Sequence, residues 1–162
     1  MYGNSTKYLL FISLTFLAGM MLLILPLPRW IIWFRPAWVF MVLVFWMIRV
    51  PHRVGIGMAW FVGLWLDLLT GTLLGQHAFV LTIIAYFVIK FHVQIRSFPT
   101  WQQMLLIALL TITYLSLQYW IMAMVGRSPD TGKFWLPVMT TTLLWPWVYL
   151  LLRDFQLRFE LG

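Results

Sequence analysis

The sequence predicts an all-α polytopic membrane protein in which six transmembrane helices form one domain over residues 1–162. Apolar residues make up 63 % of the chain and charged residues only 9 %, whereas about a quarter of the residues in a soluble domain are charged. The charges leave long uncharged runs, and the longest covers residues 97–126. That run exceeds the roughly 18 apolar residues that indicate a transmembrane helix. A soluble enzyme and a disordered chain are therefore excluded.

The expected helices cover about residues 8–26, 36–50, 54–72, 77–95, 100–124 and 134–153. The first ends at Pro26 and Pro28, and its apolar run is too long for a signal-peptide core, so we expect it to be retained. The segment 29–35 is too short to span and predicts an interfacial or re-entrant turn. The second helix begins at Pro36, which suits a first helical turn. Its ~22 Å length falls short of the ~30 Å hydrocarbon core.

The remaining helices are separated by recognisable breaks. Glycine and threonine dominate residues 70–76, between the third and fourth helices, and Pro99 precedes the fifth. Residues 126–133 form the longest polar loop. The sixth helix carries Pro137 and Pro146, which predict a kink.

The basic residues predict the orientation of these helices. The chain has 11 Lys and Arg against 4 Asp and Glu. They flank apolar runs singly or in pairs, which is unlike a nucleic-acid patch and typical of contact with membrane lipids. With the N-terminus inside, seven basic residues are cytoplasmic and four are outside, so both termini are predicted to be cytoplasmic. The inner set is Lys7, Arg49, Arg53, Lys90, Arg96, Arg153 and Arg158, and the outer set is Arg29, Arg35, Arg127 and Lys133.

Residues that could support catalysis or metal binding are scarce. The chain has no cysteine and none of the common catalytic or nucleotide-binding motifs. Its three histidines, His52, His77 and His92, fall near helix ends and form no evident ligand cluster. We therefore expect no enzyme, no cofactor and no metal site.

Asp67 is the acidic residue that lies within a predicted span. A carboxylate in the hydrocarbon region is costly and suggests a function by default. One reading is a proton, ion or ligand site. The other is a structural anchor that accepts hydrogen bonds from the nearby break or from a basic side chain, for which Arg35 is the first candidate. We favour the anchor because no second acidic residue lies within the spans.

Small residues recur every four positions along the third helix. The row consists of Gly55, Ala59, Gly63, Asp67, Gly71 and Gly75. Residues at this spacing form one ridge, and small ones allow close approach of a second helix in lipid. The ridge either packs inside this chain or forms a groove for another protein's helix.

Two further sets of polar residues each allow two interpretations. On the fifth helix, Thr111, Tyr114 and Gln118 form a row that predicts either interhelical hydrogen bonds or a small-molecule pocket. Near the second helix, His52 and Arg53 form a basic cluster with Arg49. That cluster either meets lipid headgroups or docks a cytoplasmic partner.

Several short segments, in order along nearly the whole chain, resemble the MreD family of bacterial rod shape-determining proteins, closest to its proteobacterial branch. Ala37 departs from the pattern, because a polar residue such as Asn or Asp is expected there. The segments are Arg35-Pro36-Ala37-Trp38, Pro51-His52-Arg53-Val54, Leu66-Asp67 with Gly71 and Leu74-Gly75, Ile84-Ala85-Tyr86, Trp101-Gln102-Gln103, and Leu144-Trp145-Pro146-Trp147 before Leu152-Arg153.

The resemblance implies a non-enzymatic subunit of the cell-elongation (Rod) machinery in the bacterial inner membrane. It implies direct binding to MreC, which has one membrane helix and a large periplasmic domain. The wider complex would contain MreB, RodZ, the glycosyltransferase RodA and a penicillin-binding transpeptidase. The family is also similar in fold to the six-helix substrate-binding subunits of vitamin ECF transporters.

Two rival functions remain on the sequence alone. One is an ECF-type transporter subunit that holds a small molecule among the third, fifth and sixth helices, and the other is an intramembrane enzyme. A transporter subunit requires a closed pocket with convergent polar groups. An adaptor requires an open apolar groove or patch.

Overall fold

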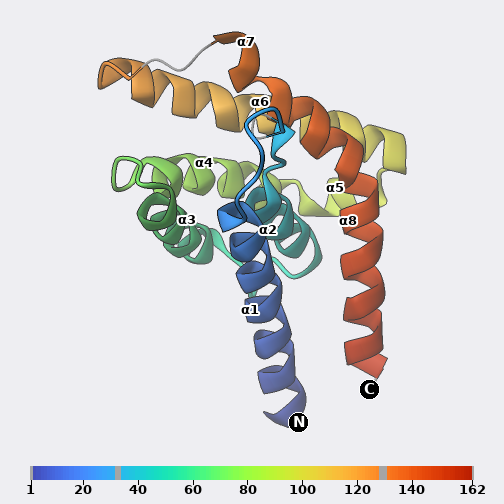
Figure 1. The fold of residues 1–162 in the computed structure, drawn as a ribbon. Coiled ribbons are helices and arrows are strands. Elements are labelled where there is room, and N and C mark those ends of the chain that lie inside the picture. The colour runs from blue at the N-terminus through green and yellow to red at the C-terminus, as the bar shows by residue number, and fades with distance from the viewer. Residues whose placement is uncertain (1, 32–33, 128–130, 162) are drawn as a thin grey trace.

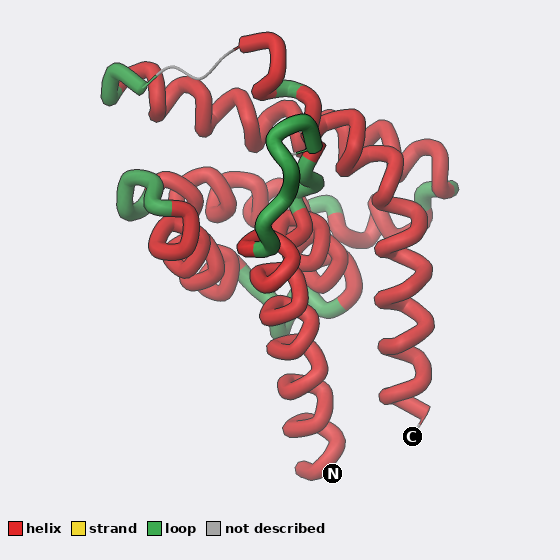
Figure 2. The backbone as a smooth tube through the Cα atoms, in the orientation of Figure 1, coloured by secondary structure: helices red, strands yellow, loops and turns green. Residues whose placement is uncertain are grey.

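The fold was analysed in a computed structural model that describes residues 2–31, 34–127 and 131–161. Within these ranges every regular element is a helix, which confirms the predicted all-α class (Figure 2). The elements are α1 (Tyr2–Ile24), α2 (Trp38–Arg49), α3 (Ile56–Thr70), α4 (Gln76–Lys90), α5 (His92–Ser97), α6 (Thr100–Met124), α7 (Thr131–Phe134) and α8 (Leu136–Leu161).

Three of the described helices are long and apolar enough to cross a membrane. They correspond to α1, α6 and α8. The apolar helices α2, α3 and α4 are shorter, with 12, 15 and 15 residues. At 1.5 Å per residue, α2 is about 18 Å long, well short of a ~30 Å hydrocarbon core. The chain is thus a helical membrane protein, and six crossings remain a prediction.

Helix α2 forms the centre of the molecule and packs against α1, α4, α5 and α8 (Figure 1). All of its residues from Val39 to Ile48 are buried. A helix that is hydrophobic on every side is stable only when other helices enclose it. Trp46 fixes the contact with α1, because its Nε1 donates to Thr15 Oγ1 over 2.9 Å.

Some helix boundaries differ from the predicted ones. The fourth predicted helix is interrupted at Phe91, after which α5 begins. Hydrogen bonds to other helices hold α5 separately, since Gln103 Nε2 on α6 donates to the Ile95 carbonyl and Arg96 donates to carbonyls at the end of α2. Helix α8 continues beyond the predicted end to Leu161, because Gln156 is buried against α1 and α2.

The two prolines of α8 have different effects. Pro137 lies in the first turn, where its missing N–H is not needed. Pro146 lies in the interior, and α8 changes direction part-way along its length (Figure 1). The first part packs against α6, and the last part descends beside α1. The predicted kink thus belongs to Pro146.

The two predicted loops are described in part. Residues 29–31 form a turn, and Phe34 has 3₁₀ conformation. Ile32 and Trp33 lie outside the described residues, and so do residues 128–130 of the polar loop before α7.

Candidate functional site

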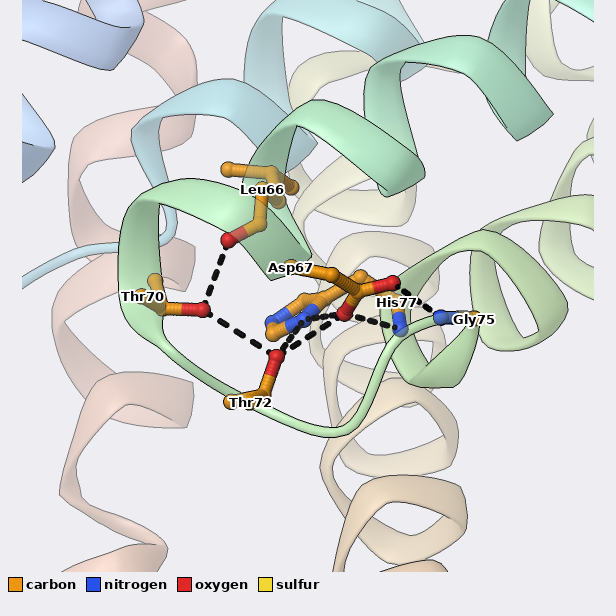
Figure 3. Close-up of polar contacts among 6 residues, drawn as sticks. All are labelled: Leu66, Asp67, Thr70, Thr72, Gly75 and His77. Carbon is orange, nitrogen blue, oxygen red and sulfur yellow. Dashed lines mark hydrogen bonds and ion pairs between the residues drawn. The ribbon is translucent and has the colours of Figure 1, made fainter.

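Asp67 is buried and lies at the centre of a polar cluster where α3 turns into α4 (Figure 3). Its carboxylate accepts hydrogen bonds from the backbone N–H groups of Gly75 and His77, at 2.8 and 2.9 Å. It also accepts one from the Thr72 hydroxyl at 2.9 Å. The fourth contact is with His77 Nδ1, at 2.7 Å. These four contacts use both carboxylate oxygens, as expected of a structural anchor.

The turn below this cluster depends on two glycines. Gly71 ends α3 with φ +69°, and Gly75 precedes α4 with φ +97°. Both values lie in the left-handed region that favours glycine. The turn returns the chain so that the N–H groups of Gly75 and His77 point toward Asp67. These donors at the start of α4 would otherwise lack a helical partner.

The expectation that Arg35 is the basic partner of Asp67 is wrong. The Arg35 guanidinium instead donates to the Leu23 and Leu25 carbonyls, at 2.5 and 2.6 Å. It satisfies carbonyl groups at the C-terminal end of α1, which have no partner within the helix. The nitrogen that faces Asp67 belongs to His77. The sequence alone identifies His77 only as a histidine near a helix end.

The middle of the small-residue ridge of α3 packs inside the chain, whereas Gly71 and Gly75 face open space. Ala59 and Gly63 are buried, and a Cβ atom on Gly63 would lie 2.3 Å from the Ala78 Cα atom of α4. That distance is far inside van der Waals contact, so the two helix backbones touch at Gly63. Gly55 lies at the N-cap of α3, near the Pro51 carbonyl. Of the two readings of the ridge, the contacts favour internal packing.

The segment from Arg35 to Trp38 joins α1, α2 and α8. Pro36 is buried, and the Ala37 N–H donates to the Thr141 hydroxyl of α8 over 3.1 Å. Ala37 is the N-cap of α2 and makes no side-chain cap. A polar residue at this position would suit an N-cap. In this chain the hydroxyl of Thr141, which sequence reasoning missed, provides a polar contact there instead.

The basic cluster near the start of α3 is larger than the sequence predicted. His52 is exposed, whereas the Arg53 guanidinium lies over the Tyr8 ring at 4.7 Å. Arg49 Nε donates to Gln156 Oε1 over 3.0 Å, and Gln156 Nε2 donates to the Tyr8 hydroxyl over 2.6 Å. Sequence reasoning missed Tyr8 and Gln156, since nothing in a single sequence pairs positions 148 residues apart.

The polar row of α6 lies within the helix packing. Thr111, Tyr114 and Gln118 are all buried. The Thr111 hydroxyl donates to the Ile107 carbonyl of its own helix. The Tyr114 ring stacks on Phe40 at a centroid distance of 4.9 Å and lies 6.2 Å from the His77 ring. These contacts join α6 to α2 and α4.

Two open apolar grooves flank α1. The first, of about 740 Å³, lies between α1 and α3 and is called the α1–α3 groove. Its lining comprises Ser13, Phe16, Leu17, Met20, Met21 and Ile24 on α1 and Met58, Phe61, Val62, Trp65 and Leu69 on α3. The second, of about 380 Å³, lies between α1 and α8 over α2 and is called the α1–α8 groove. Their surfaces are apolar, as expected of a site that receives an apolar partner in a membrane.

Comparison with known proteins identifies relatives of this chain. The model of the family described as "rod shape-determining protein MreD" matches residues 4–155. A protein of Haemophilus influenzae named "Rod shape-determining protein MreD" is 34 % identical over 145 residues, which cover 85 % of this chain and 87 % of that protein. No solved structure matches the chain. The family match covers Asp67 with its partners and both grooves, and it places the chain in the MreD family of rod shape-determining membrane proteins, with a role in cell shape.

Proposed function

We propose that this chain is a non-enzymatic subunit of the cell-elongation (Rod) complex in the bacterial inner membrane. It binds MreC within the membrane and helps to organise lateral peptidoglycan synthesis with MreB, RodZ, RodA and a penicillin-binding transpeptidase. Membership of the MreD family supports the role in cell shape. The observation that carries the proposal of an adaptor is the open α1–α3 groove.

The dimensions of the α1–α3 groove suit one transmembrane helix. Its walls run from Ser13 to Ile24 on α1 and from Met58 to Leu69 on α3. Each wall is 12 residues long, which corresponds to about 16 Å, or three helical turns. Leu17, Met21, Phe61 and Trp65 project from these walls with more than half of their surface exposed.

The chemistry of the groove also favours a helix. Ser13 is its one polar lining residue among those described, so a small polar ligand would find few partners. Helices associate in lipid through close apolar packing, and the flexible side chains of Met20, Met21 and Met58 adapt readily to a partner surface. We therefore assign the membrane helix of MreC to this groove.

The ECF-type rival receives less support. Such a subunit would present polar groups to a ligand, whereas Thr111 and Tyr114 of α6 are engaged in packing between helices. Asp67 already accepts four hydrogen bonds. These contacts favour the adaptor over the transporter subunit.

Six crossings with cytoplasmic termini are part of the proposal. Contacts gather the beginning of α1, the ends of α2 and α8, and α5 at one end of the molecule. Contacts at the other end join the end of α1 to the beginnings of α2 and α8. These contacts make α1 antiparallel to α2 and α8, as six crossings with both termini on one side require of these three helices. The first group contains Arg49 and Arg96, which the charge bias places in the cytoplasm.

The orientation can be tested by thiol labelling, because the chain has no cysteine. Single cysteines replace Ser128 in the polar loop and Arg158, an exposed residue of α8. An impermeant thiol reagent added to intact spheroplasts should label position 128 and leave position 158 unlabelled until the membrane is opened. Labelling of position 158 in intact spheroplasts would contradict the orientation.

The partner site can be tested by cysteine cross-linking to a single-cysteine series along the MreC membrane helix. Cysteines at Leu17 and Phe61 face the α1–α3 groove, whereas cysteines at Leu109 of α6 and Leu143 of α8 are equally exposed controls outside it. We expect disulfide formation from the first pair, with a helical periodicity along MreC, and little from the second. Cross-links from the control positions alone would place MreC elsewhere, and cross-links from no position would contradict direct binding.

A further inference from the structure

Four arginines lie around the contacts that join α1, the end of α2, α5 and α8. Arg49 and Arg53 are linked through Tyr8 and Gln156, as described above. Arg96 of α5 joins them, because its Nη2 donates to the Ile48 and Arg49 carbonyls at 2.8 and 3.0 Å. Arg153 lies one helical turn before Gln156 on α8. We call Arg49, Arg53, Arg96 and Arg153 the arginine cluster.

The arginine cluster has no carboxylate partner among the described residues. The ion pair found in those parts of the chain joins Asp67 to His77 at the α3–α4 turn. The nearest acidic neighbour in sequence, Asp154, is exposed. Arg53 Nη1 and Arg153 Nε are buried nitrogen atoms that lack a hydrogen-bond partner in the described structure. Buried charge without a counter-ion is costly, and the rest of each guanidinium group is at least partly exposed, so this arrangement favours an anion beside the exposed side of the cluster.

The α1–α8 groove begins beside this cluster. It is lined at that end by Phe11, one helical turn after Tyr8, and by Phe155, whose ring lies 6.4 Å from that of Phe11. From Phe11 it extends along α1 to Leu22, a distance of about 16 Å. One leaflet of the hydrocarbon core is about 15 Å thick. The groove therefore has the length of one acyl chain, and the cluster lies where that chain's headgroup would be.

We propose that this end of the molecule is a binding site for an anionic phospholipid. The lipid phosphate accepts hydrogen bonds from Arg53 and Arg153, and one acyl chain lies in the α1–α8 groove. Arginine suits this role because its planar guanidinium binds phosphate oxygens in a fixed geometry. Basic pockets between transmembrane helices bind anionic headgroups in this way. The site is separate from the α1–α3 groove, so it does not depend on MreC binding.

The proposal is tested with the purified full chain in mixed micelles, by native mass spectrometry and lipid titration. The probes are dioleoylphosphatidylglycerol, dioleoylphosphatidylcholine and inorganic phosphate. We expect the chain to retain phosphatidylglycerol in preference to phosphatidylcholine, and excess inorganic phosphate to leave it bound. Replacing both Arg53 and Arg153 by Gln should weaken phosphatidylglycerol binding about 25-fold, or about fivefold for each arginine. The matched control replaces Arg29 and Arg127, which are exposed and lie outside the cluster, and should change binding less than twofold.

A second variant tests the groove without changing charge. Ala18 lines the middle of the α1–α8 groove and is exposed, so Ala18→Trp should fill the groove and weaken phosphatidylglycerol binding with the fold intact. This variant keeps the test decisive if the double arginine variant fails to elute as a folded species. Equal retention of the two lipids, or equal losses in the arginine and control variants, would overturn the proposal. Unchanged binding to Ala18→Trp, or displacement by phosphate, would overturn the assignment of the groove to an acyl chain.

Discussion

The α3–α4 hairpin and helix α1 differ in how completely their surfaces are used within the chain. In the hairpin, backbone meets backbone at Gly63, and Asp67 ties the turn together with four hydrogen bonds. Helix α1 contacts α2 and the end of α8 on part of its surface and leaves grooves on both sides. The comparison shows that small residues and a buried carboxylate stabilise the chain itself. Large exposed apolar residues remain available for a partner or for lipid.

The largest loss of stability is expected from placing a side chain where the backbones of α3 and α4 touch. Gly63→Leu places a side chain where the Ala78 backbone already lies, so α3 and α4 must separate. Overpacking of this kind costs about 3 kcal/mol or more when the backbone has to move. We expect a strongly reduced membrane level and, in detergent, loss of a cooperative thermal transition.

Gly57→Leu is the matched control, because a Cβ atom at Gly57 on the same helix meets nothing within 4 Å. It should leave the membrane level and the melting temperature unchanged. If Gly63→Leu were as stable as Gly57→Leu, close packing of α3 on α4 would be wrong.

A smaller loss of stability is expected from removing the carboxylate of Asp67. Asp67→Leu leaves the N–H groups of Gly75 and His77 and the Thr72 hydroxyl without their acceptor. Each group left without an acceptor away from water costs roughly 1–3 kcal/mol. The Thr72 hydroxyl can still bond to Thr70 or His77 and the turn can relax, so we expect about 3 kcal/mol in all. Asp67→Asn keeps one acceptor oxygen and should lose about 1 kcal/mol. Thermal unfolding in detergent would measure both.

Complementation of rod shape separates the anchor from a proton-coupled role. An anchor predicts that Asp67→Asn restores rod shape far better than Asp67→Leu, in proportion to their membrane levels. A stable Asn variant that still binds MreC yet fails to restore shape would contradict the anchor and indicate a function for the ionised carboxylate.

A still smaller loss of stability is expected at the junction of α2 and α8. Thr141→Val removes the hydroxyl that accepts from the Ala37 N–H while keeping the side-chain volume. The loss should be about 1 kcal/mol, the usual contribution of one buried hydrogen bond. Thr113→Val is the control, since that exposed hydroxyl bonds only to its own helix. Equal melting temperatures for the two variants would mean that the Thr141 hydroxyl does not stabilise this junction.

Much of this organisation could be predicted from residues with local effects. Pro26, Pro99 and Gly71 end or begin helices in the structure close to where the sequence places them, because their backbone preferences act over a few residues. The anchor role of Asp67 also follows from local position, since its backbone partners lie within ten residues.

The parts that could not be predicted depend on contacts between distant residues. The break at Phe91 contains neither proline nor glycine, and α5 is held by Arg96 and Gln103 through groups on other helices. Charge alone favours pairing Arg35 with Asp67, whereas the fold brings Arg35 to carbonyl acceptors at the end of α1. The grooves lie between helices that do not pack closely together. The pattern of a single sequence does not reveal which helices these are.

The smallest effect on the stability of the chain itself is expected in the α1–α3 groove. Leu17 and Phe61 are more than half exposed, and in a membrane their lost contacts are replaced by lipid chains that are equally apolar. The double variant Leu17→Ala with Phe61→Ala should therefore change the stability of the isolated chain by about 0.5 kcal/mol or less. Retention of MreC in co-purification should nevertheless fall severalfold, because shortened side chains no longer pack against its helix.

The matched control, Leu109→Ala with Leu143→Ala, removes equally exposed residues outside the groove and should leave both measurements unchanged. A stability loss as large as that of Asp67→Leu would mean that the groove supports the fold, and unchanged retention of MreC would move the partner to another surface.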